Sequence, residues 1–143
     1  MSHHQYDSNV VAILVPSSPT YKQRLAASEL QRGLLQLGVY GTVAVGEWSG
    51  ISGRAGLRFV LTNDRDPGEG YSIGARTEGS DPEVHLHGMN EQALLYAVFD
   101  FLERQGAIFG IDGEAYPLTQ PAALQLPPAD APWSGSPRFA VRG

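Results

Sequence analysis

The chain has 143 residues, 42% of them hydrophobic, a length and composition typical of one globular domain with a sizeable buried core. A formal net charge of −5, a single lysine and nine scattered arginines argue against the clustered basic surface that a nucleic-acid partner requires. The absence of cysteine excludes disulfides and thiolate metal sites.

The first predicted elements are a buried strand and an amphipathic helix. Val10–Val15 is an unbroken apolar run, which is typical of a strand buried on both faces. Ser18 as N-cap and Pro19 at the first helical position predict the start of a helix, and Gly38 predicts its end. Gly33 inside the helix costs about 1 kcal/mol, which indicates that another element packs close to it. The predicted inward face consists of Ala26, Leu30, Leu34 and Leu37, with Leu25 beside it.

Two more strands are predicted after this helix. Val39–Val45 predicts a strand, and a strand, helix and strand within about 35 residues favour a right-handed parallel crossover. The glycine-rich segment Gly46–Gly56 is typical of a loop. Leu57–Thr62 then predicts a third strand.

Residues 70–113 predict a strand, a second strand, a helix and a further strand. The turn Glu78–Pro82 separates two segments of alternating polarity, which predicts a β-hairpin. Asn90 is a good N-cap for a helix that runs to Gln105, and Gly106 supplies a left-handed stop. Gly106–Ile111 predicts the further strand. The apolar stripe that makes this the expected core helix consists of Leu94, Leu95, Tyr96, Val98, Phe99, Phe101 and Leu102.

Together these elements predict an α/β fold, a mixed sheet of about five or six strands carrying two main helices. We expect one α/β domain over residues 1–118. Five prolines between Thr119 and Pro137 predict that residues 119–143 form a linker or an extended arm, to which Ala123–Leu126 could add one short strand.

The sequence shows no signal peptide and no membrane span. Met1–Asp7 lacks a positive region followed by an apolar core, and no apolar run approaches the roughly 20 residues that cross a bilayer. We therefore expect no membrane partner, and the sequence assigns no cellular compartment.

Three segments together carry a family resemblance. Glu69–Ile73, Val84–Gly88 and Ala93–Glu103 follow one another in an order that resembles the small α/β domain preceding the catalytic barrel of several glycoside hydrolases. These are the family 67 α-glucuronidases and the family 20 β-hexosaminidases. Ala97 stands where those domains often have glycine.

The resemblance implies a function for the chain. In those enzymes the acid and the nucleophile lie on the barrel, so we expect a non-catalytic accessory domain that is inactive alone and braces the catalytic domain of the same polypeptide. Pro137–Gly143 has the form P-x-F-x-x-R-G, which resembles the segment that opens the first barrel strand. We therefore expect this chain to be an N-terminal piece of a longer enzyme. Gly110–Pro117 resembles the barrel-facing end of the family domain, which makes Tyr116 a candidate interdomain residue.

The histidines and glycines predict no cofactor. His85 and His87, spaced i, i+2, lie on one face of a strand, as two zinc ligands can, but no third ligand is identifiable, so we predict no metal. Gly50–Gly56 matches neither phosphate-binding glycine motif. No G-x-S-x-G nucleophile motif is present.

The carboxylates form two pairs that glycoside hydrolysis could use. Asp64 and Asp66 share a strand end, and Asp100 and Glu103 lie one helical turn apart. A solvated turn and a solvated helix face, with an ion pair from Asp100 to Arg104, explain them more simply. We predict no catalytic residue in this chain.

The two tryptophans are the residues through which the chain would contact carbohydrate or another domain. Trp48 lies in the glycine-rich loop and Trp133 in the proline-rich tail. Aromatic faces stack on sugar rings, so the alternative function is a carbohydrate-binding module; contact with a neighbouring domain is the simpler interpretation. A third hypothesis is a free-standing α/β protein with a site in a crevice at the carboxyl edge of the sheet.

Overall fold

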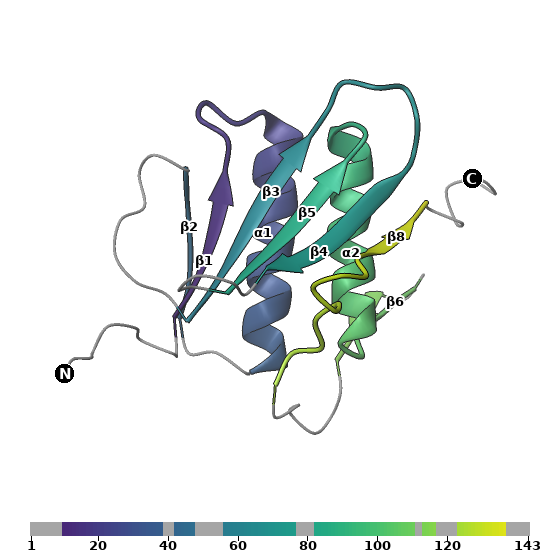
Figure 1. Cartoon of the computed structure of the whole chain (residues 1–143). Coiled ribbons are helices and arrows are strands. Elements are labelled where there is room, and N and C mark those ends of the chain that lie inside the picture. Colours follow the sequence, from purple (N-terminus) through teal and green to yellow (C-terminus); the bar gives the residue numbers. More distant parts are fainter. Residues whose placement is uncertain are drawn as a thin grey trace.

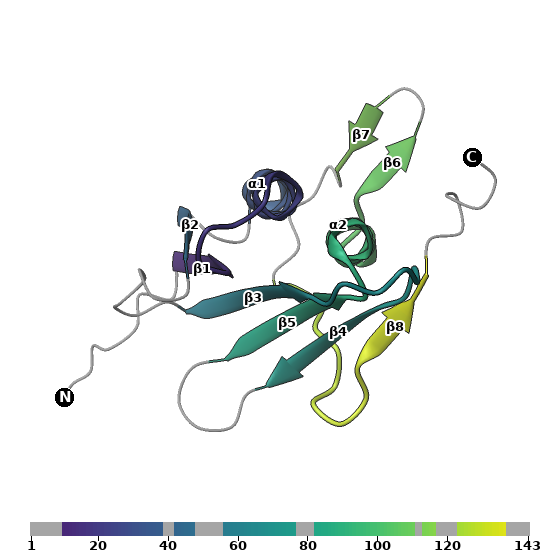
Figure 2. The same cartoon turned by 90° about the horizontal axis from the view of Figure 1, so that it is seen from above.

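Two helices lie across one face of a six-stranded mixed sheet, as the views in Figure 1 and Figure 2 show. The computed structural model describes residues 10–38, 42–47, 56–76, 82–110, 113–116 and 123–136. The predicted α/β class, with a mixed sheet of five or six strands and two helices, is confirmed. Within the described residues, no helix is both long and apolar enough to cross a membrane.

The sheet has the strand order β2-β1-β3-β5-β4-β8. Strands β2, β1, β3 and β5 are parallel to one another, whereas β4 is antiparallel to both of its neighbours, β5 and β8. The strands of this sheet are β1 (Val10–Val15), β2 (Thr42–Glu47), β3 (Leu57–Asn63), β4 (Tyr71–Arg76), β5 (Glu83–Gly88) and β8 (Trp133–Gly135). The helices are α1 (Tyr21–Leu37) and α2 (Glu91–Arg104), and β6 (Ile108–Gly110) pairs with β7 (Gly113–Ala115) in a separate hairpin.

The parallel crossover from β1 through α1 to β2 is confirmed, but the predicted start of α1 is wrong. The N-cap is Thr20, whose side chain accepts from the Gln23 backbone amide while the Gln23 side chain accepts from the Thr20 amide. Ser18 has a φ of 53°, far from the extended conformation of an N-cap. The predicted helix end at Gly38 is confirmed by its left-handed φ of 78°. Residues 39–41 of the predicted second strand lie outside the described part.

Helix α2 begins and ends as the sequence predicts. Asn90 is extended and its side chain accepts from the Ala93 amide, and Gly106 follows the helix with a φ of 107°. The rings of Phe101 on α2 and Phe59 on β3 meet edge to face, with centroids 5.2 Å apart. The helix therefore packs on the middle of the sheet.

Alternation along the strands divides the sheet into a buried face and an open face. The residues that point toward the helices are the apolar ones, and the core strand residues are Val11, Ile13, Val15, Val43, Leu57, Phe59, Leu61, Ile73, Val84 and Leu86. The other face carries partly exposed residues such as Val60, His85 and His87. Both predicted histidines thus share the open face.

The sixth strand comes from the proline-rich tail, which is a departure from the prediction. Ala123–Leu126 forms no strand; β8 instead begins at Trp133, whose partner on β4 is Ile73. The predicted strand at Gly106–Ile111 exists as β6, but it pairs with β7 outside the main sheet. Edge pairing of this kind depends on long-range contacts that a local pattern does not contain. The division into residues 1–118 and residues 119–143 stays a prediction.

Candidate functional site

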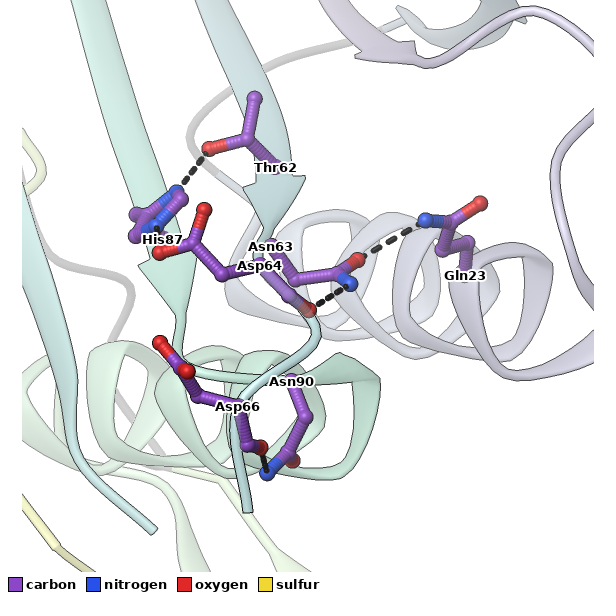
Figure 3. Close-up of polar contacts among 7 residues, drawn as sticks. All are labelled: Gln23, Thr62, Asn63, Asp64, Asp66, His87 and Asn90. Carbon is purple, nitrogen blue, oxygen red and sulfur yellow. Dashed lines mark hydrogen bonds and ion pairs between the residues drawn. The ribbon is translucent and has the colours of Figure 1, made fainter. Parts of the chain in front are cut away.

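A polar cluster lies where the parallel strands β3 and β5 end, beside the N-termini of both helices (Figure 3). His87 Nδ1 lies 2.6 Å from Thr62 Oγ1, and His87 Nε2 lies 3.0 Å from Asp64 Oδ2. A carboxylate only accepts, so the proton of this contact lies on Nε2, which donates to Asp64. The sequence missed this cluster, because Thr62 and His87 meet only through the register of β3 with β5.

The order hydroxyl, imidazole, carboxylate is that of a nucleophilic hydrolase site, which also needs donors for an oxyanion. The neighbouring backbone amides are engaged: Asp64 donates to Gly88 O and Asp66 donates to Met89 O. The Asp64 side chain is 60% exposed, so water competes for its interactions. The cluster joins the end of β3 and the loop after it to β5.

Two asparagines form hydrogen bonds at the same edge of the sheet, where β3 and β5 end. Asn63 accepts from Gln23 on α1 and donates to the backbone of Asp64 (Figure 3). Asn90 caps α2 and donates to the carbonyls of Asp66 and Gly68, at 2.7 and 2.6 Å. At this edge of the described chain the Asn90 amide group holds the loop after β3.

The two histidines that could have shared a metal contact different carboxylates. His85 Nε2 lies 2.9 Å from Glu83 Oε1, whereas His87 contacts Asp64. Within the described ranges, no group of three histidine, aspartate or glutamate residues could hold a metal ion.

The second carboxylate pair belongs to the packing between α2 and β4. Asp100 accepts from the Tyr71 hydroxyl at 2.9 Å and from Arg104 Nε at 3.0 Å, so the expected ion pair with Arg104 is present. Burial, and then the hydrogen bond to Asp100, raise the pKa of Tyr71 far above its ordinary value. Burial, and then the Asp100 charge, raise the pKa of Glu103. The Asp100 carboxylate is thus engaged by Tyr71 and Arg104.

Trp133 borders a hollow at the C-terminal end of α2. The guanidinium of Arg104 lies over the Trp133 ring, 4.4 Å from its centroid. The hollow has a volume of about 460 Å³. Its lining residues are Arg104, Gln105, Gly106, Ala123, Gln125 and Trp133.

Gln105 ties the tail to the end of α2. The residue is only 7% exposed, and its side chain donates to Gln125 O and accepts from Gln125 N, at 2.8 and 2.7 Å. This pair closes one side of the hollow. The sequence offered no signal for it, because the two residues lie 20 positions apart in a segment without periodicity.

Of the other two candidate contact residues, Tyr116 lies within the described part of the chain. Tyr116 follows β7, packs partly against the core, and its hydroxyl lies 3.5 Å from Glu114 Oε2. Burial raises the pKa of Tyr116. Glu114 also pairs with Arg32 on α1. Trp48 lies outside the described residues.

Comparison with known proteins gives a distant structural likeness only. No family model and no curated protein sequence matches the chain. Sixteen chains of solved structures match, and one of these is a GH138 enzyme targeting pectin rhamnogalacturonan II. The match has 14% identity and a TM-score of 0.49, and it covers 66% of this chain and 13% of the enzyme. A distant structural neighbour is therefore a glycoside hydrolase, of which this chain matches a small part.

Proposed function

We propose that this chain is a non-catalytic accessory domain of a glycoside hydrolase and braces the catalytic barrel of the same polypeptide. The observation that carries the proposal is that Asp64 and Asp100, one carboxylate from each candidate pair, are engaged in internal contacts. Asp100 binds Tyr71 and Arg104, and His87 contacts both Thr62 and Asp64. The family resemblance of residues 69–103 supports the same interpretation.

The attachment of the tail fits a bracing role. Strand β8 pairs with β4 from Tyr71↔Gly135 to Ile73↔Trp133, and Gln105 holds the tail further back at Gln125. Two separate attachments fix the position from which the chain continues beyond residue 136. A brace needs such a fixed exit, whereas a flexible linker would transmit no orientation.

A carbohydrate-binding module is the second candidate, and the hollow beside Trp133 favours it. One limit on this candidate is that Arg104 already covers one face of the indole, so a sugar cannot stack on that face without displacing it. Trp48, the other tryptophan proposed for this role, lies outside the described residues.

Hydrolysis of aryl glycosides tests the proposal. We expect the 143-residue chain to show no turnover above buffer, and the full polypeptide encoded by its gene to hydrolyse at least one substrate of the panel. Turnover by the chain alone would overturn the accessory role. In the full polypeptide, Gln105→Ala should lower the thermal midpoint of the catalytic domain if the tail transmits the brace, and an unchanged midpoint would contradict bracing.

A further inference from the structure

We propose that the hollow lined by Arg104, Gln125 and Trp133 binds one or two uncharged sugar units of a polysaccharide. The inference rests on the proposed carbohydrate-active function and names the class of ligand. The hollow lies between the end of α2 and the tail, at the opposite end of the helix from the Asn90 cap.

Arg104 supplies unused donors at this hollow. Its guanidinium has five N–H groups, and Nε donates to Asp100. The terminal nitrogens have no hydrogen-bond partner within the described ranges. The guanidinium carbon lies 4.4 Å from the centroid of the Trp133 ring, and this contact uses none of the terminal N–H groups as hydrogen-bond donors, so they can donate to hydroxyl oxygens. At this hollow the guanidinium thus offers a fork of hydrogen-bond donors beside the indole of Trp133.

The charges around Arg104 favour an uncharged ligand. Asp100 forms an ion pair with Arg104 and its side chain is 19% exposed, so it balances the guanidinium at close range. Glu103 lies next to Arg104 in the chain and close enough to Asp100 to feel its charge. A carboxylated sugar would compete with Asp100 for a guanidinium whose charge is already balanced, whereas hydroxyl groups both donate and accept.

The size and lining of the hollow suit a short stretch of saccharide. Its volume of about 460 Å³ lies within the roughly 300–1,000 Å³ of small-molecule sites. The wall combines an indole with amide and guanidinium groups, and such sites join apolar surface to a few placed polar groups. The Gln105–Gln125 pair fixes the wall formed by the tail, so the hollow is formed before any ligand arrives.

Titration of the 143-residue chain, followed by NMR, tests the site. Cellohexaose and xylohexaose are the uncharged probes, and a galacturonate hexamer is the acidic probe. The readout is the indole N–H signal of Trp133, assigned with Trp133→Phe. We expect saturable shifts with at least one uncharged hexamer, and affinity for the galacturonate hexamer at least about tenfold weaker.

Arg104→Lys keeps the positive charge and removes the fork, so it should weaken binding of the uncharged hexamer about tenfold. The matched control is Arg24→Lys on α1, where the arginine donates to Pro19 O, and it should bind as the wild type does. An equal loss in both variants would show that the fork at Arg104 has no special role.

Three results would overturn the inference. These are no saturable shift with either uncharged hexamer at about 10 mM, preference for the galacturonate hexamer, or binding unaffected by Arg104→Lys. Glycoside turnover by the full polypeptide is measured separately. If the full polypeptide turns over glycosides but the chain does not bind the hexamers, the inference fails and the proposed function stands. If the chain binds a hexamer but the full polypeptide shows no turnover, the inference stands and the proposed function fails.

Discussion

Leu102 on α2 occupies the space that any side chain at Gly33 on α1 would need. A Cβ added at Gly33 would lie 2.6 Å from both methyl carbons of Leu102 and 3.1 Å from its Cγ. Leu102 is 1% exposed, so its side chain has little room to move. The expectation that another element packs close to Gly33 is confirmed, and it explains a glycine in the middle of a helix.

Gly33→Ala should destabilise the fold by about 1–3 kcal/mol, because overpacking outweighs the gain in helix propensity of about 1 kcal/mol. Urea denaturation measures the change. The control is a double-mutant cycle with Leu102→Ala, which removes the methyl groups that the new Cβ would meet. In that background Gly33→Ala should be neutral or stabilising. An equal penalty in both backgrounds would show that Leu102 is not the obstacle.

Asn90→Ala should cost about 2–3 kcal/mol, because it removes the cap of α2 and two hydrogen bonds to the loop after β3. Asn90→Asp keeps the acceptor for the Ala93 amide but loses both donors, so it should fall between alanine and the wild type. Thr20→Ala is the matched control, since it removes the cap of α1 and an exposed hydrogen bond to Glu91 but no bond to that loop, and should cost about 1 kcal/mol. If Asn90→Asp is as stable as the wild type, the loop bonds contribute nothing.

Tyr71 should make the fold less stable in alkaline solution. Burial and the hydrogen bond to Asp100 raise its pKa in the folded state above the ordinary 10.0. Above about pH 10 the unfolded chain has lost a proton that the folded chain keeps. The stabilisation that protonated Tyr71 contributes to the fold is therefore complete below about pH 10 and is lost as pH rises toward the pKa of Tyr71 in the folded state.

Tyr71→Phe removes this titration, so its unfolding midpoint in urea should fall less steeply than that of the wild type between about pH 10 and pH 12. The slope should not become flat, because burial also raises the pKa of Tyr116. If the urea midpoints of variant and wild type fall in parallel as pH rises, the raised pKa does not belong to Tyr71.

Gln105→Ala should release the tail from the end of α2. It leaves the backbone amide and carbonyl of Gln125 without their partner in a partly buried position, which costs about 1–3 kcal/mol locally. Proteinase K should then cut residues 123–132 severalfold faster. Gln92→Ala, which removes only the acceptor for Lys22, should leave the cutting rate unchanged. Equal rates in both variants would show that β8 alone holds the tail.

Only those features of the site that depend on local sequence spacing could be predicted. The spacing of His85 and His87 placed both on one strand face, and the Asp100–Arg104 pair followed from helical geometry. The partners of those residues could not be predicted. Tyr71 meets Asp100 across 29 positions of sequence, and Thr62 meets His87 across 25.

By itself the sequence determined the α/β class, both helix ends marked by glycine, the hairpin of β4 with β5, and the apolar faces. These features depend on periodicity, capping and turn chemistry within a few residues. Tertiary structure alone decided that β8 rather than β6 completes the sheet, and that Trp133, Arg104 and Gln125 surround one hollow. Such contacts depend on which edge of the sheet remains unpaired and which surfaces pack together after the core has formed. The local sequence pattern around each residue does not encode these long-range contacts.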